Sequence, residues 1–125
     1  MQNELTAEHS MKAKIELPSE LYTHEVLPDG RTITCCTMRQ RILHCIGMVD
    51  SCAHKPYTRH GKKYYRPWRN YFTTNAPDAE WEKLCEAGYA AHGSVSDRGV
   101  MYWLTREGLD WLGEALEVHI YDEHE

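Results

Sequence analysis

The stretch APDAEWEKLCEAGYAAHGSVSDRGVMYWLTREGLDWLGEAL, residues 76–116, decides the fold of this chain. Its first part predicts a helix over residues 76–87, with Asn75 as the N-cap, Pro77 in the first turn and Gly88 as the stop. The apolar residues of this segment share one helical face. They are Trp81, Leu84 and Cys85.

A β-hairpin and a closing helix should follow. Segments 89–92 and 100–104 favour strands and enclose a polar tip bounded by glycines, which is typical of a two-stranded ribbon. Thr105 is a good N-cap for the last helix, which carries leucines at helical spacing. These are Leu109, Leu112 and Leu116, with Trp111 at their flank.

Upstream, residues 13–17 alternate apolar and charged side chains and predict a short strand that Pro18 ends. Segments 22–27 and 31–35 flank Pro28-Asp29-Gly30, where proline presets the turn and glycine accepts a positive φ, so they predict a β-hairpin.

Thr37 and Gln40 have the spacing of a capping box, which predicts the start of a helix that Gly47 ends. One face of this helix is apolar. It consists of Met38, Ile42, Cys45, Ile46 and Val49.

The remaining segments are less regular. Residues 48–70 show neither helical nor strand periodicity and predict a long loop, followed by a short strand over 71–74. Residues 118–121 alternate and predict either a further strand or a contact with a second copy.

Composition favours one small globular domain. A chain of 125 residues with 42% hydrophobic and 26% charged residues is long enough for a single modest core. No apolar run could span a bilayer and no signal peptide is recognisable, so we expect a cytoplasmic protein with reduced thiols. Of the five cysteines, those beside predicted helices should be small buried hydrophobes. These are Cys36, Cys45 and Cys85.

Charge is distributed unevenly along the chain. The net charge is -5, yet residues 51–76 hold six basic residues and no acid, whereas residues 77–125 hold twelve acids and three basic residues. A basic band between acidic segments indicates a polar partner surface.

The order of helix, hairpin and helix in residues 84–109 resembles winged-helix proteins, in which a glycine leads into the wing and a Leu-Thr turn starts the next helix. Segments 41–47 and 69–72, together with this pattern, are similar to small winged-helix-like proteins of bacteriophages and prophages. The resemblance covers residues 37–116 and implies the fold more than the task. It implies a phage or prophage-type binding protein in the cytoplasm of a bacterial host.

Residues 54–69 carry the first functional hypothesis, which is nucleic-acid binding. Lysine and arginine neutralise phosphates, and the interleaved aromatic rings can stack on bases. The alternative is that Tyr65, Trp68 and Phe72 pack into the core, while the basic residues are solvated on a loop or pair with the acidic C-terminal half. The candidate contacts are Lys55, Arg59, Lys62, Lys63, Tyr64, Arg66 and Arg69.

The second hypothesis is a protein-binding module. The helix over 76–87 occupies the position of a recognition helix but is acidic, so it would repel phosphates and could instead dock on a basic surface of a host nucleic-acid enzyme or defence protein. The candidate residues are Asp78, Glu82 and Glu86.

Other chemistries have little support in the sequence. Cys52 and His54 are of metal-ligand type, but the spacing is not that of a paired zinc clip, so we expect no metal and no cofactor. No hydrolase or phosphate-loop motif is present, which argues against an enzyme.

The sequence therefore predicts a single α+β, winged-helix-like domain with an N-terminal β-hairpin extension. Residues 1–12 should be flexible, 13–36 form the strand and hairpin, 37–117 the winged-helix-like domain, and 118–125 a tail. No membrane partner is expected, and a homodimer is left open.

Overall fold

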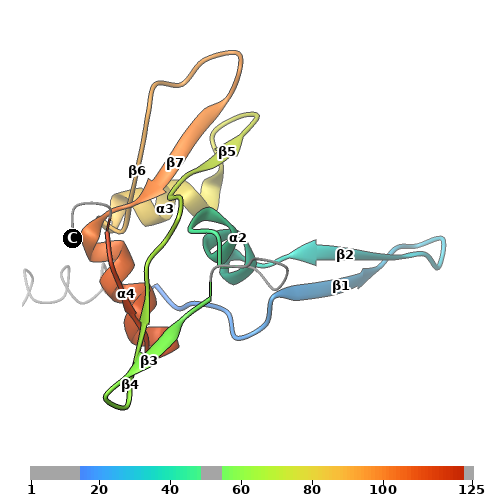
Figure 1. Cartoon of the computed structure of the whole chain (residues 1–125). Coiled ribbons are helices and arrows are strands. Elements are labelled where there is room, and N and C mark those ends of the chain that lie inside the picture. Colours follow the sequence, from blue (N-terminus) through green and yellow to red (C-terminus); the bar gives the residue numbers. More distant parts are fainter. Residues whose placement is uncertain (1–14, 49–54, 123–125) are drawn as a thin grey trace, which may run out of the picture.

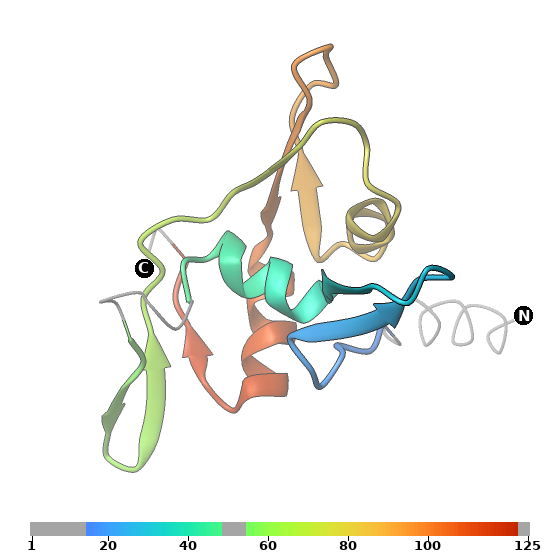
Figure 2. The same cartoon turned by 90° about the vertical axis from the view of Figure 1, so that its right-hand side faces the viewer.

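The structure is a computed structural model that describes residues 15–48 and 55–122. This part of the chain folds into helices α2–α4 and strands β1–β8, an α+β architecture. The helices form a central body, and the small sheets point away from it in different directions (Figures 1 and 2). Each projecting arm therefore presents its own surface.

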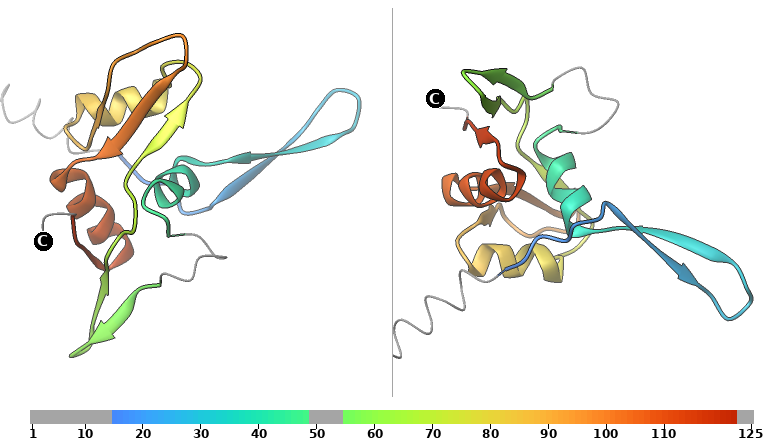
Figure 3. Two further views of the ribbon diagram at one scale, coloured as in Figure 1. Left: turned by 45° about the horizontal axis from the view of Figure 1, so that its top comes forward. Right: turned by 90° about the horizontal axis from the view of Figure 1, so that it is seen from below.

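The first arm is the predicted N-terminal hairpin, which is confirmed. β1 (Tyr22–Val26) pairs antiparallel with β2 (Thr32–Cys36), and Gly30 adopts the expected positive φ of 89° in the turn. Every strand residue of this ribbon is exposed. Figure 3 shows it extending well clear of the body.

The strand predicted for residues 13–17 is wrong over Ile15–Leu17, and residues 13–14 lie outside the described part. Ile15 and Leu17 do pack against the core, while Glu16 is exposed. The segment is anchored by Trp111, whose Nε1 donates to the Ile15 carbonyl at 3.1 Å. The alternation thus reflects packing on the body rather than membership of a sheet.

Helix α2 (Met38–Cys45) begins as predicted, because the Thr37 hydroxyl accepts a hydrogen bond from the Gln40 amide. Its predicted end is also confirmed, with Gly47 at φ 77° just beyond the C-cap. The expected apolar face is buried at Met38, Ile42, Cys45 and Ile46; Val49 lies outside the described residues.

The loop predicted for residues 48–70 is wrong over its centre. β3 (Tyr57–Arg59) and β4 (Lys62–Tyr65) form an antiparallel hairpin. Its two-residue turn is His60 and Gly61, with φ 54° and 78°, a backbone that matches the natural twist of paired strands. This hairpin was missed because its strands contain basic and aromatic residues but no aliphatic ones, so the apolar–polar alternation of a half-buried strand is absent.

The predicted C-terminal strand is confirmed as β8 (His119–Ile120), which pairs in parallel with β4. Tyr65 and Ile120 are direct partners, and both are fully buried on the inner face of this sheet. The β3–β4 hairpin, which we call the basic hairpin, is thereby fixed to the C-terminal segment of the chain.

Helix α3 (Ala79–Glu86) starts later than predicted, so Asn75 is not its N-cap. Asp78 takes that place: its carboxylate accepts from the Trp81 amide at 3.0 Å. The Asp78 amide in turn donates to the Tyr102 hydroxyl at 3.0 Å, a tertiary contact that sequence spacing cannot reveal.

The last sheet has the order β5-β7-β6, built from β5 (Phe72–Thr74), β7 (Val100–Leu104) and β6 (Ala90–His92). The strand predicted at 71–74 and both predicted ribbon strands are confirmed. Helix α4 (Arg106–Leu116) follows, capped by Thr105 as expected.

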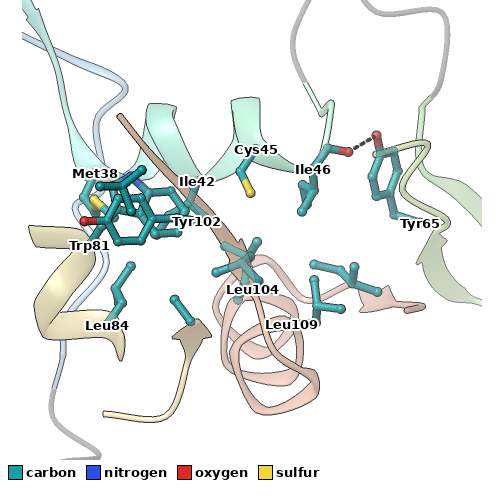
Figure 4. Packing of buried hydrophobic residues seen from close by; sticks show 14 residues of the cluster. Met38, Ile42, Cys45, Ile46, Tyr65, Trp81, Leu84, Tyr102, Leu104 and Leu109 are labelled. Atoms are coloured by element: carbon teal, nitrogen blue, oxygen red, sulfur yellow. Dashed lines mark hydrogen bonds between the residues drawn. The ribbon is translucent and has the colours of Figure 1, made fainter. Parts of the chain in front are cut away.

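The core lies where the helices meet the inner faces of the sheets (Figure 4). Trp81 is fully buried and stacks between Phe72 and Tyr102, with ring centroids 5.5 and 5.3 Å away. At the other end, the buried Tyr65 hydroxyl donates to the Ile46 carbonyl. No helix in the described ranges has the length and apolar character needed to cross a membrane.

The cysteines differ from expectation in one respect. Cys45 is buried and Cys85 is partly buried, but Cys36 is exposed, as is its neighbour Cys35, because the ribbon that carries them has no covering layer. Burial raises the pKa of the Cys45 thiol to about 12.

These thiols should therefore differ in reactivity. In a Cys52→Ser/Cys85→Ser background at pH 8, an aromatic disulfide reagent should label Cys35 and Cys36 rapidly and Cys45 only on unfolding, because the thiolate is the reactive species. Mass spectrometry of the labelled peptides measures this order. Rapid labelling of Cys45 in the folded protein would contradict the packing of α2.

Gly108 should be the least replaceable residue of α4. A Cβ at this position would lie 1.8 Å from the Tyr89 carbonyl oxygen, so the helix must move away from the strand connection. Gly108→Ala should lower the free energy of unfolding by at least about 2 kcal/mol, as overpacking does. Urea unfolding measures it, with the exposed Glu114→Ala in the same helix as control.

Candidate nucleic-acid interface

The outer face of the β3-β4-β8 sheet is covered by aromatic rings. Tyr57 and Tyr64 are direct cross-strand partners, and Tyr64 is the partner of His119. Side chains alternate along a strand, so these rings lie opposite the buried Tyr65 and Ile120. We call the set Tyr57, Tyr64, His119 and Tyr121 the aromatic face.

The tyrosine rings of the aromatic face are nearly parallel. The Tyr57 and Tyr64 centroids are 5.7 Å apart at an interplanar angle of 22°, and those of Tyr64 and Tyr121 are 6.1 Å apart at 18°. A hydrogen bond with the Tyr57 hydroxyl raises the pKa of Tyr121, and removal from water adds to the rise. The rings are thus held in a fixed row.

Basic side chains surround this row. Arg59, Lys62 and Arg66 follow the same alternation as the tyrosines and belong to the same face. The Arg66 guanidinium lies 4.4 Å from the centroid of the Tyr121 ring. Within the part of the chain that the structure describes, Arg59 and Lys62 make no ion pair, so their charge is available to a partner.

A cleft begins at Tyr121 and runs beside residues 67–71 toward the end of β7. Trp68 and Tyr71 stand at its wall and are 53% and 47% exposed. Its other lining residues are Pro67, Arg69, Asn70, Trp103, Leu104, Thr105, Arg106, Leu109, Tyr121 and Asp122. We call this the aromatic cleft.

Hydrogen bonds of Trp68 and Arg69 fix the wall of the aromatic cleft. The Trp68 indole N–H donates to the Gly47 carbonyl at 3.2 Å. Arg69 donates through Nε to the His44 carbonyl at 3.0 Å, and its guanidinium lies 5.0 Å from the Trp68 ring centroid and 5.5 Å from that of Tyr71. Arg69 therefore orients the two rings.

Asn70 holds this segment on the body. Its amide nitrogen donates to the Leu104 carbonyl at 2.8 Å, and its amide oxygen accepts from the Leu104 amide at 2.9 Å. The Cys45 thiol is a further donor to the same oxygen, at 3.4 Å. A side chain thus replaces a neighbouring strand at the end of β7.

Beside the hairpin lies a groove that carries both signs of charge. Lys62 and Lys63 line it together with Tyr64 and His119 of the aromatic face, and so do acids of α4 and of its C-terminal end. These acids are Asp110, Glu114 and Glu117. Because they would repel phosphates, a nucleic acid should approach from the aromatic face rather than from this groove.

The structure brings most of the predicted nucleic-acid contacts together. Lys55, Arg59, Lys62, Lys63, Tyr64 and Arg66 lie on or next to the β3–β4 hairpin, whereas Arg69 belongs to the cleft. Tyr65 is in the core, Phe72 is partly buried against it, and Trp68 is exposed. The competing expectation of core packing thus holds for two of these three rings.

Sequence reasoning missed Tyr57, His119 and Tyr121 as members of the face. For Tyr57, the signal was the presence of tyrosine and basic residues on both sides of His60-Gly61. His119 and Tyr121 alternate in the tail, but their pairing with β4 is non-local.

The acidic residues of the second hypothesis are largely engaged within the molecule. Asp78 caps α3 and pairs with Arg41 at 3.2 Å, and Glu82 accepts from the Tyr102 hydroxyl at 2.7 Å. Glu86 is exposed. A docking partner would therefore have to displace contacts that stabilise the fold.

Among the described residues, no group of three or more His, Cys, Asp and Glu side chains is placed to hold a metal ion. Cys52 and His54 lie outside the described part. Comparison of the chain with protein-family models, with curated proteins and with solved structures finds no match.

The Asn70 contacts predict a strong effect on stability. Asn70→Ala leaves the Leu104 amide and carbonyl without their partner, so the free energy of unfolding should fall by about 2 kcal/mol or more. Asn70→Asp keeps the acceptor oxygen but loses the N–H donor, so its free energy of unfolding should remain below that of wild type. Thermal unfolding measures both, and an unchanged melting temperature for Asn70→Ala would contradict this role.

Proposed function

We propose that this protein binds nucleic acid through the aromatic face and the basic side chains around it. The observation that carries the proposal is the union, on one exposed sheet face, of a row of tyrosine rings with the cations Arg59 and Lys62, which make no ion pair among the described residues. Cations attract the phosphates, and aromatic rings bind bases without regard to sequence.

The geometry of the arm supports this function. The hairpin projects from a body whose overall charge is negative, so it is the part that a polyanion can reach with least repulsion (Figure 2). The row of rings is also held by the β8 strand and a hydroxyl–hydroxyl contact. Little side-chain entropy is then lost on binding.

We also propose that the body is a variant winged helix. The order α2, β5, α3, β6, β7, α4 and the sheet order β5-β7-β6 support this reading. Within residues 55–75, a β-hairpin stands where a second helix would be expected before α3. The acidic α3 is poorly suited to a DNA groove, so the nucleic-acid contact is assigned to the hairpin instead.

Salt dependence tests the proposal. A fluorescently labelled 12-nucleotide strand should bind at low salt, with an affinity that falls as salt rises, because binding releases counterions. Lys62→Ala should reduce the slope of log affinity against log salt by roughly 0.7, the value for one phosphate contact on a single strand.

The matched control is Lys83→Ala, which removes an exposed lysine from α3, away from the hairpin. It should leave the slope close to that of wild type. Absence of binding at low salt, or equal effects of the Lys62 and Lys83 substitutions, would overturn the proposed interface.

A further inference from the structure

The aromatic cleft adjoins the aromatic face, because Tyr121 belongs to both. A ligand lying along the tyrosine row therefore reaches the mouth of the cleft without leaving the surface.

Three rings that line the cleft differ from the other tryptophan side chains in their ring contacts. Trp81 is enclosed in the core stack, and Trp111 stacks on Tyr89 with a centroid distance of 4.8 Å. In contrast, Trp68, Tyr71 and Trp103 have no aromatic ring partner among the described residues. The Arg69 guanidinium lies over one face of Trp68 and of Tyr71. Three rings without an aromatic partner thus line one cavity.

From this arrangement we propose that the aromatic cleft takes one unstacked nucleobase, and that the ligand class of this protein is single-stranded nucleic acid. The inference rests on the proposed function and names its substrate class. A base gains its contacts by stacking on an aromatic side chain, which every base can do because every base has a π-face.

The polar groups of the cleft suit the edge and backbone of such a nucleotide. Arg69 offers a planar cation already oriented by the His44 carbonyl. Arg106 and Asp122, which form an ion pair at 3.6 Å, also line the cleft, whereas the Thr105 hydroxyl is used in capping α4 and in its bond to the Gly88 carbonyl. Trp68 is held by Gly47, so the wall is formed before a ligand arrives, which lowers the entropic cost of binding.

A duplex cannot use this cleft without opening. Its bases are stacked on both faces and paired at their edges, and extrusion of one base costs a few kcal/mol. A single strand presents bases that are already free. The combination of cleft and tyrosine row therefore selects single strands, whereas the surrounding cations alone would attract both forms.

The test compares ring removals inside and outside the cleft. Tyr71→Ala should weaken binding of the 12-nucleotide single strand about tenfold or more, the effect of losing one base stack. Its effect on a duplex of equal length should be less than about twofold. Tyr71→Phe keeps the stacking face and should bind the strand like wild type.

Two controls match the exposure of the tested residue. Tyr22→Ala removes a tyrosine that is 45% exposed on the β1–β2 ribbon, and Met101→Ala removes a side chain that is 48% exposed on β7, the strand that carries Trp103. Both should leave the affinity for the single strand unchanged. Thermal unfolding of every variant separates loss of binding from loss of fold.

A second measurement replaces the ligand instead of the protein. A strand of the same length whose sugars carry no bases should bind wild type more weakly than the normal strand does. The baseless strand should bind Trp103→Ala as well as it binds wild type, because it has no base that could stack on the Trp103 ring. If Trp103→Ala is unfolded, Tyr71→Ala takes its place.

The outcomes distinguish the two proposals. If the protein binds single strands and duplexes equally, with salt dependence and no effect of Tyr71→Ala, the cleft is not a base site while nucleic-acid binding stands. If no nucleic acid binds at low salt, both proposals fall.

Discussion

The Asn70 amide is the contact on which the arrangement of the surface depends. By bonding both backbone groups of Leu104, it fixes the segment between the basic hairpin and β5 to the end of β7. Residues 66–71 have no regular structure of their own, so side-chain contacts set their path, and Trp68 and Arg69 add bonds to Gly47 and His44. At the end of β7, the Asn70 amide satisfies backbone groups that a neighbouring strand would otherwise pair.

The acidic and basic residues lie on different parts of the fold, the body and the projecting hairpin. The acids of α3 are tied to the body through Arg41 and Tyr102, whereas the basic residues of β3 and β4 project on an arm with exposed side chains. The paired charges stabilise the fold, whereas the basic side chains of the arm are exposed to solvent. The acidic body also disfavours binding of a polyanion anywhere except on that arm.

Caps and turns could be predicted from the sequence, whereas contacts between distant segments could not. The caps at Thr37 and Thr105 and the turn at Gly30 depend on neighbouring residues, so spacing alone locates them. The start of α3 depends on the distant Tyr102 hydroxyl, and the aromatic face on a parallel pairing with His119. The sequence grouped the basic residues correctly. The rings beside them come from β3 and β4 and from the distant β8 segment, which no local pattern connects.

The parallel pairing of β4 with β8 also has a consequence for biosynthesis. Tyr57 and Tyr64 leave the ribosome long before Tyr121, which completes the row. During that interval the nascent hairpin carries its full positive charge and two uncovered rings, yet lacks the strand that orders them. The aromatic face is therefore complete only after residue 121 has left the ribosome and β8 has paired with β4.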